Sequence, residues 1–267
     1  MNITELLNYQ FIQNAYLAGT FIALLCAVLG LILVLKKLSL IGDGLAHVSF
    51  GAIALGLFFG FYPFYIAIPV VILASYLIWH LEKRSKLYGD AAIGIVSAVG
   101  IASGVILASI SRGFNIDLFS YLFGNILAIS QTEVLLSIIL SLIALTIIII
   151  FYRNLFITTF DEEYAKTRGI KTDKINLILM TLTAITVVLA IKVVGIMLVS
   201  ALLIIPAASS LQIAKGFKSA IIIAGINAVF SVLIGITVSF YLDIPAGATI
   251  VIINFIIFIF MFLGKKI

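Results

Sequence analysis

Long apolar runs separated by short polar segments fill this chain of 267 residues. Each run has about 20 residues, the length of an α-helix that crosses the hydrocarbon core of a bilayer. The runs lack the alternation of apolar and polar positions, over about ten residues, that is typical of a membrane β-barrel strand. The pattern predicts nine membrane-spanning helices, near residues 14–35, 42–60, 63–80, 90–109, 131–151, 174–193, 195–212, 219–240 and 245–263.

Two joints between these helices are so short that a count of eight or ten stays open. One runs from Gly60 to Pro63 and the other from Val193 to Gly195, and both require a tight turn. Hydrophobic residues make up 64% of the chain and charged residues 10%, against about 45–50% and 25% in an ordinary soluble domain. We therefore expect an all-α polytopic membrane protein in which residues 1–267 form a single transmembrane domain.

The basic residues distinguish the two sides of the membrane. If the amino terminus is outside, 14 of the 16 Lys and Arg residues fall in inner segments, and only Arg112 and Lys192 fall in outer ones. Short cytoplasmic loops are enriched in Lys and Arg. We therefore expect an external amino terminus and a cytoplasmic carboxyl terminus. This distribution of the net charge of +5 indicates contact with membrane lipid and no binding of nucleic acid.

Two connections are longer than a simple turn. The outer one, residues 111–131, is apolar but interrupted, and we expect short helices in the outer interface. The inner one, residues 152–173, is the most charged stretch of the chain. Its acidic residues Asp161, Glu162 and Glu163 favour a helix start, its basic residues Lys166 and Arg168 favour the end, and Gly169 would stop the helix. Such a helix can present a surface to another protein, and a solvated loop is the alternative.

Small residues recur at intervals that allow helix backbones to pack closely. The sets of small residues at these intervals are Gly56 with Gly60, Gly94 with Ala98 and Ala102, and Gly100 with Gly104.

Asp43 and His47 are the candidate functional pair. The two residues are four positions apart in a predicted helix, so their side chains lie on one face of it. Because an ionisable side chain at the centre of a bilayer costs about 2.5–3.5 kcal/mol or more, such residues tend to serve transport or ion binding. Carboxylate and neutral imidazole are ligands of Zn²⁺, Mn²⁺ and Fe²⁺. Two ligands do not complete a coordination sphere, so the pair predicts a homodimer in which two chains contribute around one axis.

Structural roles for the polar residues stay open on the pattern alone. Asp43 is placed to cap a helix that begins after Gly42, and His47 to hydrogen-bond a neighbouring helix. Lys192 is expected to snorkel at a helix end or to line an outer vestibule.

The sequence contains no Gly-x-x-x-x-Gly-Lys-[Ser/Thr] loop, so any energy from ATP would come from another chain and we do not expect an enzyme. Besides transport of metal ions driven by a partner ATPase, three kinds of function are compatible with these residues. They are a secondary metal/proton transporter that acts without an ATPase, a permease for a larger metal chelate, and an intramembrane zinc hydrolase.

Four stretches, taken together and in this order, resemble the integral-membrane permease of bacterial ABC transporters that import zinc, manganese or ferrous iron. They are Leu40-Ile-Gly-Asp-Gly-Leu-Ala-His47 with Gly51 and Gly56, Asp117-Leu-Phe-Ser-Tyr-Leu-Phe-Gly-Asn-Ile-Leu127, Asp161-Glu-Glu-Tyr-Ala-Lys-Thr-Arg-Gly-Ile170, and Lys192-Val-Val-Gly-Ile-Met-Leu-Val-Ser-Ala-Leu-Leu-Ile-Ile-Pro-Ala-Ala208. The chain keeps Asp43 and His47 of the Gly-Asp-x-x-x-His motif of such permeases and departs from the usual residues at Gly44 and at Val48-Ser-Phe50.

The resemblance implies a multi-pass importer subunit in the cytoplasmic membrane of a bacterium. Its partners would be a second copy of itself, cytoplasmic ATP-binding ABC subunits and an extracytoplasmic metal-binding protein. It implies no permanently bound cofactor, because the Mn, Zn or Fe ion is the cargo, and it assigns Asp43 and His47 to hold that ion in transit. It assigns the inner helix to coupling with the ATPase through Asp161, Glu162, Glu163, Tyr164, Ala165, Arg168 and Gly169.

Overall fold

The computed structural model describes residues 8–84, 89–111, 121–126 and 129–264. Within these residues, nine helices are long and apolar enough to cross a membrane, as the sequence predicts. They are α2 (Gln10–Leu35), α3 (Ile41–Phe58), α4 (Pro63–Arg84), α5 (Gly89–Ile110), α7 (Gln131–Ile150), α10 (Thr172–Val194), α11 (Val199–Ile213) with the 3-10 turn η2 (Ile196–Leu198) before it, α12 (Phe217–Leu242) and α13 (Ala246–Gly264). Most predicted ends agree within two residues, but α2 begins earlier and α4 ends later than the pattern indicated.

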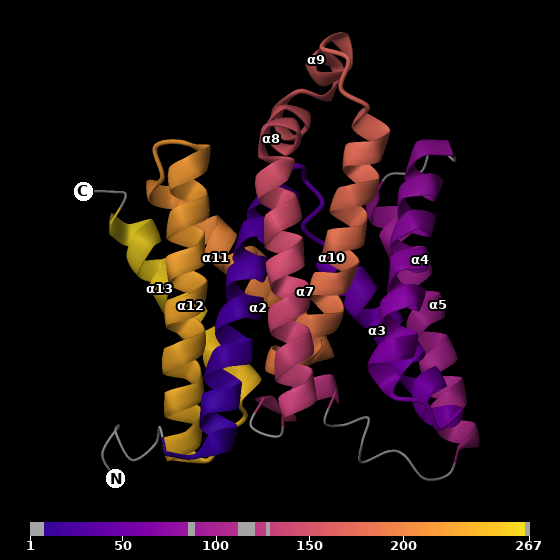
Figure 1. Cartoon of the computed structure of the whole chain (residues 1–267), viewed down its shortest axis with the longest axis vertical. Coiled ribbons are helices and arrows are strands. Elements are labelled where there is room, and N and C mark those ends of the chain that lie inside the picture. Colours follow the sequence, from indigo (N-terminus) through magenta and orange to yellow (C-terminus); the bar gives the residue numbers. More distant parts are fainter. Residues whose placement is uncertain (1–7, 85–88, 112–120, 127–128, 265–267) are drawn as a thin grey trace.

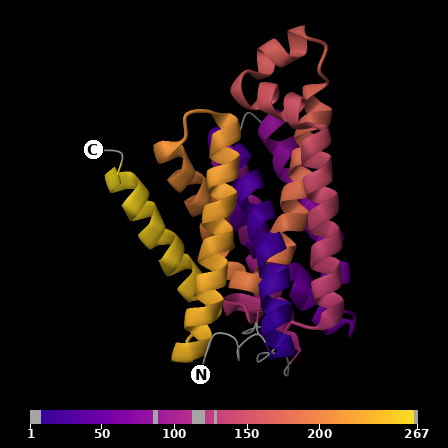
Figure 2. The ribbon, with the colours of Figure 1, turned by 60° about the vertical axis from the view of Figure 1, so that its left-hand side comes forward.

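Two short helices, α8 (Tyr152–Phe160) and α9 (Glu162–Thr167), connect α7 to α10. They project beyond the other helices at one end of the bundle, which we call the α9 end (Figure 1). Because the number of long helices is odd, α2 begins at the opposite end and α13 finishes towards the α9 end (Figures 1 and 2).

The helices α2, α3 and α10 are the most buried. α2 packs against α7, α11 and α12 on one side of the bundle, while α3 packs against α4 and α5 on the other. On the outer helices the exposed side chains are apolar, for example Leu73, Val99, Ile149 and Phe260. An apolar outer surface is what a helix bundle surrounded by lipid tails requires.

Both short joints are turns between separate helices. Gly60 and Gly195 adopt φ values of +70° and +85°, which glycine reaches without the steric cost that a Cβ would bring. At Gly195 a Cβ would also lie 2.4 Å from the carbonyl carbon of Phe123. The chain around Gly124 therefore packs directly against the backbone of the α10–η2 turn.

Close packing of α3 on α5 confirms part of the small-residue pattern. A Cβ on Gly51 would lie 2.5 Å from the backbone oxygen of Gly100, and a Cβ on Gly104 would lie 2.5 Å from the ring of Phe50. Gly56 also meets a backbone, with Pro63 Cα at 3.0 Å. The prediction was wrong for Gly60 and Gly94, because nothing lies within 4 Å of a Cβ built at either position.

The predicted outer interfacial helices fall largely on residues 112–120 and 127–128, which lie outside the described residues. Between them, 121–123 form a helical turn.

The contact between α3 and α5 predicts that Gly100→Ala destabilises the protein. The added Cβ would lie 2.6 Å from Val48 Cα and 3.1 Å from the backbone oxygen of His47, so α3 must move away. Overpacking of this kind costs about 1–3 kcal/mol. We expect a lower midpoint of thermal unfolding for the detergent-solubilised variant. Gly94→Ala on the same helix is the control, and equal midpoints for the two variants would contradict the close packing.

Candidate functional site

The link between α2 and α3 turns back into the bundle. Lys37 adopts a left-handed φ of +61°, and Leu38 packs against the hydrophobic core. A Cβ on Gly44 would lie 2.4 Å from Cγ2 of Ile93, so the first turn of α3 lies level with the second turn of α5. The start of α3 is therefore set inward from the α9 end.

Asp43 and His47 lie on the same face of α3, as their spacing predicts. Nε2 of His47 is 3.5 Å from Oδ2 of Asp43. Of the two side chains, 27% of His47 and 42% of Asp43 is exposed. On either side of Asp43 the helix is too tightly packed for a side chain, because a Cβ on Gly42 would lie 2.6 Å from Cδ1 of Leu203, and Gly44 faces Ile93. α3 is thus held between α5 and α11, while the acidic and imidazole groups stay open.

The capping interpretation of Asp43 is wrong. The N-cap of α3 is Leu40, which makes no side-chain capping bond, and Asp43 lies inside the first turn. A carboxylate there interacts favourably with the helix dipole but leaves its oxygens available. Among the described residues, no third His, Cys, Asp or Glu joins the pair in a group that could hold a metal ion.

The predicted charged helix after α8 is confirmed as α9, and the loop alternative is wrong. Oδ1 of Asp161 accepts a hydrogen bond of 2.8 Å from the backbone N–H of Tyr164, which caps the first turn. Glu162 and Glu163 lie in that turn, Lys166 lies in the last, and Gly169 ends the segment with a φ of +76°. Ala165 is buried against the bundle, whereas most of its neighbours are exposed.

One exposed aromatic and basic pair stands out on α9. Nε of Arg168 donates a hydrogen bond of 2.9 Å to the hydroxyl of Tyr164, and the guanidinium carbon lies 5.2 Å from the centre of the Tyr164 ring. Tyr and Arg are enriched among the residues that dominate protein interfaces. The pair is therefore a suitable anchor for a protein that binds the α9 end.

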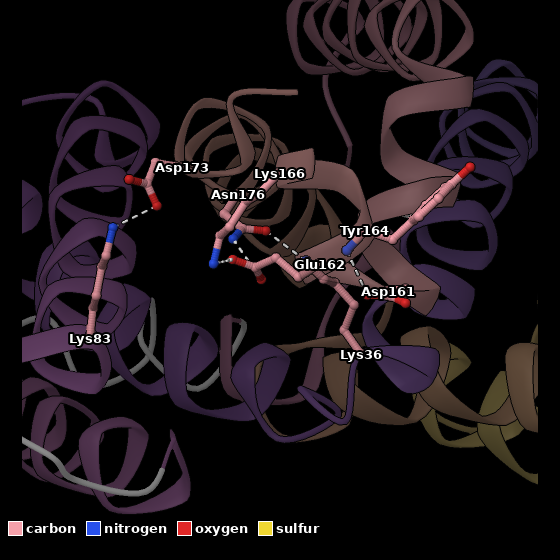
Figure 3. A network of polar contacts seen from close by, with 8 residues as sticks. All are labelled: Lys36, Lys83, Asp161, Glu162, Tyr164, Lys166, Asp173 and Asn176. Atoms are coloured by element: carbon pink, nitrogen blue, oxygen red, sulfur yellow. Dashed lines mark hydrogen bonds and ion pairs between the residues drawn. The ribbon is translucent and has the colours of Figure 1, made fainter. Parts of the chain in front are cut away.

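Next to α9, polar side chains from four segments line part of a cavity of about 400 Å³. Figure 3 shows the contacts among these polar side chains. Lys36 donates a hydrogen bond of 2.6 Å to Oδ1 of Asn176, and Lys83 forms an ion pair of 2.6 Å with Asp173. Lys166 pairs with Glu162 at 3.3 Å within α9. The sequence pattern places Lys36 among the inner basic residues but does not indicate its contact with Asn176.

Burial lowers the pKa of the Lys36 ammonium, while the carboxylates of Glu162 and Glu82 act in the opposite direction. A buried ammonium loses hydration, which disfavours its charged form, and the two nearby carboxylates favour that form.

At the opposite end, the expectation that Lys192 snorkels into solvent is wrong. Nζ of Lys192 lies 2.8 Å from Oε1 of Glu133, and only 21% and 10% of the two side chains is exposed. The ammonium also lies 4.9 Å from the centre of the Tyr121 ring, a cation–π distance. Lys192 is therefore held inside the bundle and connects α10 to α7.

Glu133 is a buried residue that the sequence reasoning missed. It completes a capping box with Ser130, whose backbone N–H and hydroxyl donate to Oε2 at 2.8 and 2.9 Å. The hydroxyl of Tyr62 donates to Oε1 at 2.7 Å, and burial together with this carboxylate raises the pKa of Tyr62. The Ser-x-x-Glu spacing was a signal for the cap, but nothing in the sequence indicated the pairing with Lys192.

The ion pair between Glu133 and Lys192 predicts that single substitutions lower the stability of the protein more than the double substitution does. Glu133→Gln or Lys192→Met alone leaves one charge without its partner, which costs about 3–5 kcal/mol where the pair is buried. The double variant removes both charges and should regain part of that loss. Thermal unfolding of all four proteins measures the cycle. Additive effects would show that the two side chains do not stabilise each other.

Comparisons with known proteins place this fold in a family. The model of the ABC 3 transport family matches residues 8–265. The manganese transport system membrane protein MntC of Halalkalibacterium halodurans is 32% identical over 258 residues, which cover 97% of this chain and 88% of that one. The high-affinity zinc uptake system membrane protein ZnuB of Haemophilus influenzae is 35% identical over 253 residues, which cover 94% and 96%.

A solved structure agrees with these relatives. PsaBC from Streptococcus pneumoniae, in complex with Fab, superposes with a TM-score of 0.88 at 32% identity and covers 97% of this chain and 94% of that chain. The resemblance inferred from four short stretches is thus confirmed over nearly the whole length. The chain belongs to the ABC 3 transport family, as a multi-pass membrane permease without ATPase activity of its own.

Proposed function

We propose that this permease is the transmembrane subunit of an ATP-driven importer for divalent transition-metal ions, Mn, Zn or Fe. The names of the relatives MntC and ZnuB support a manganese or zinc cargo. The observation that carries the proposal is the pair Asp43 and His47. Their donor atoms lie 3.5 Å apart on one face of α3, and their own chain does not enclose them.

A second copy of the chain would complete the metal site. One carboxylate and one imidazole leave most of the coordination sphere of Zn²⁺ or Mn²⁺ unfilled. Two protomers related by a twofold axis would bring two Asp43 and two His47 side chains to one ion. An ion in transit must be bound tightly enough to be selected and loosely enough to be released. Ligands drawn from two chains suit both demands, because relative movement of the protomers would open the site.

The α9 end is assigned to the cytoplasm. Among the described Lys and Arg residues, all but Lys192 lie in segments at that end. This is the bias that short cytoplasmic loops show. With this orientation the amino terminus is external, the ATP-binding subunits meet α9, and an extracytoplasmic metal-binding protein meets the opposite end. Residues 161–169 would then pass the movement of the ATPase to the helices around the ion. The family match favours this arrangement over transport without an ATPase.

The first test is metal uptake into vesicles that contain the permease and its ATPase. We expect Asp43→Ala and His47→Ala each to lower ATP-driven uptake of radiolabelled Mn²⁺ or Zn²⁺ by about tenfold or more, because loss even of a group that only orients a metal ligand costs about 10–100-fold in affinity. His80→Ala is the matched control, since His80 is the other histidine of the chain and lies exposed on α4. Unchanged uptake of both ions by His47→Ala would refute the site, and uptake without ATPase would favour a secondary transporter.

The second test concerns docking at the α9 end. We expect the double variant Tyr164→Ala/Arg168→Ala to lose most of its co-purification with the ATP-binding subunit, because it removes the exposed aromatic and basic anchor. Lys218→Ala, at an exposed site on the α11–α12 side of the same end, should keep the complex. If the double variant still co-purifies at the control level, the proposed coupling surface is wrong.

A further inference from the structure

We propose that Lys36 is a positioning residue that links α9 to the start of α3, through Asn176, and so passes movement of the ATPase to Asp43 and His47. This proposal rests on the proposed function and extends it to residues outside the coupling segment and outside the metal pair.

The link consists of two successive side-chain contacts. Nζ of Lys36 donates a hydrogen bond of 2.6 Å to Oδ1 of Asn176. Nδ2 of the same amide donates to Oε2 of Glu162 at 3.5 Å, a longer contact. Asn176 thus uses its amide oxygen towards Lys36 and its amide nitrogen towards Glu162, and the three side chains lie close together (Figure 3).

The three residues belong to three different segments of the chain. Lys36 is the C-cap of α2, and the chain then turns through residues 37–40 into α3. Asn176 lies in the second turn of α10, and Glu162 lies in the first turn of α9. Displacement of α9 therefore acts on the residue that immediately precedes the link to Asp43.

Burial and charge stabilise the hydrogen bond between Lys36 and Asn176. Lys36 is half-buried, and loss of hydration makes its charge dependent on nearby acceptors. Burial lowers the pKa of Lys36, and of the two carboxylates that act against this, Glu162 has the larger effect and Glu82 the smaller. The cavity of about 400 Å³ beside them leaves room for the side chains to move. We therefore expect Lys36 to follow its partners when α9 moves.

The structure offers a matched comparison in the same cavity. Lys83 also contacts α10, through an ion pair of 2.6 Å with Asp173, and the side chains of Lys83 and Asp173 are both half-exposed. This ion pair joins α4 to α10 and does not include α9. Lys36 and Lys83 therefore share residue type, cavity and helix partner, and differ in their connection to α9.

The experiment measures metal uptake and ATP hydrolysis in the same vesicles, with the permease and its ATPase together. We expect Lys36→Met to keep assembly and ATP hydrolysis but to lower the number of Mn²⁺ ions taken up per ATP about tenfold, within the usual range of coupling between sites. Lys36→Arg keeps a donor and should restore the ratio. Lys83→Met should leave the ratio near that of the wild type. A residue needed only for folding would lower uptake and hydrolysis together.

A second variant guards against a folding defect. Asn176→Leu should lower the ratio as Lys36→Met does, and the double variant should be no worse than either one. If Lys36→Met fails to assemble, Asn176→Leu decides the question. A wild-type ratio in these variants, or an equal loss in Lys83→Met, overturns the proposal while His47→Ala still tests the metal site. If vesicles with the wild-type permease and its ATPase take up neither Mn²⁺ nor Zn²⁺, this proposal and the proposed function are both overturned.

Discussion

The cost of an unpaired charge in a bilayer governs where this chain places its polar side chains. Lys192 lies inside the bundle, where it pairs with Glu133 and the Tyr121 ring, and Lys36 is half-buried, where it donates a hydrogen bond to Asn176. Helices satisfy their own backbone groups, so side chains are what remains to be paired. Asp43 and His47 differ from these pairs, since each has the other as a partner at a longer distance and both stay partly exposed.

That difference separates the structural ion pair from the proposed metal-binding pair. Around Glu133, four donor groups converge on two oxygens, and the carboxylate has little capacity left for a ligand. Asp43 lies between two glycines that pack against Leu203 and Ile93, and 42% of its own side chain stays exposed. The first arrangement fixes helices in place, and the second leaves oxygen and nitrogen donors available, as a site of transient ion binding requires.

The membrane helices and α9 could be predicted because their signals are local. Apolar length defines a span, and Asp161 and Gly169 define the ends of α9 within one segment. Contacts between distant segments were not predictable, since they depend on how the helices rotate against each other. Gly94 and Gly100 show this well, because both lie on α5 in similar surroundings of sequence, yet Gly100 meets α3 and Gly94 meets open space. For the same reason Lys192 was expected to snorkel at a helix end or to line an outer vestibule, and neither its pairing with Glu133 nor the role of Asn176 was predicted.

The capped ends of α9 have a consequence for assembly. A helix of six residues is too short to be stable alone, but Asp161 satisfies its first turn, Gly169 closes its last, and Ala165 anchors it to the bundle. A subunit that docks here meets a surface that is already ordered and loses little conformational entropy on binding. Preorganisation of this kind favours a stable association, and under the proposed function an ordered α9 would transmit displacement that a flexible loop would absorb.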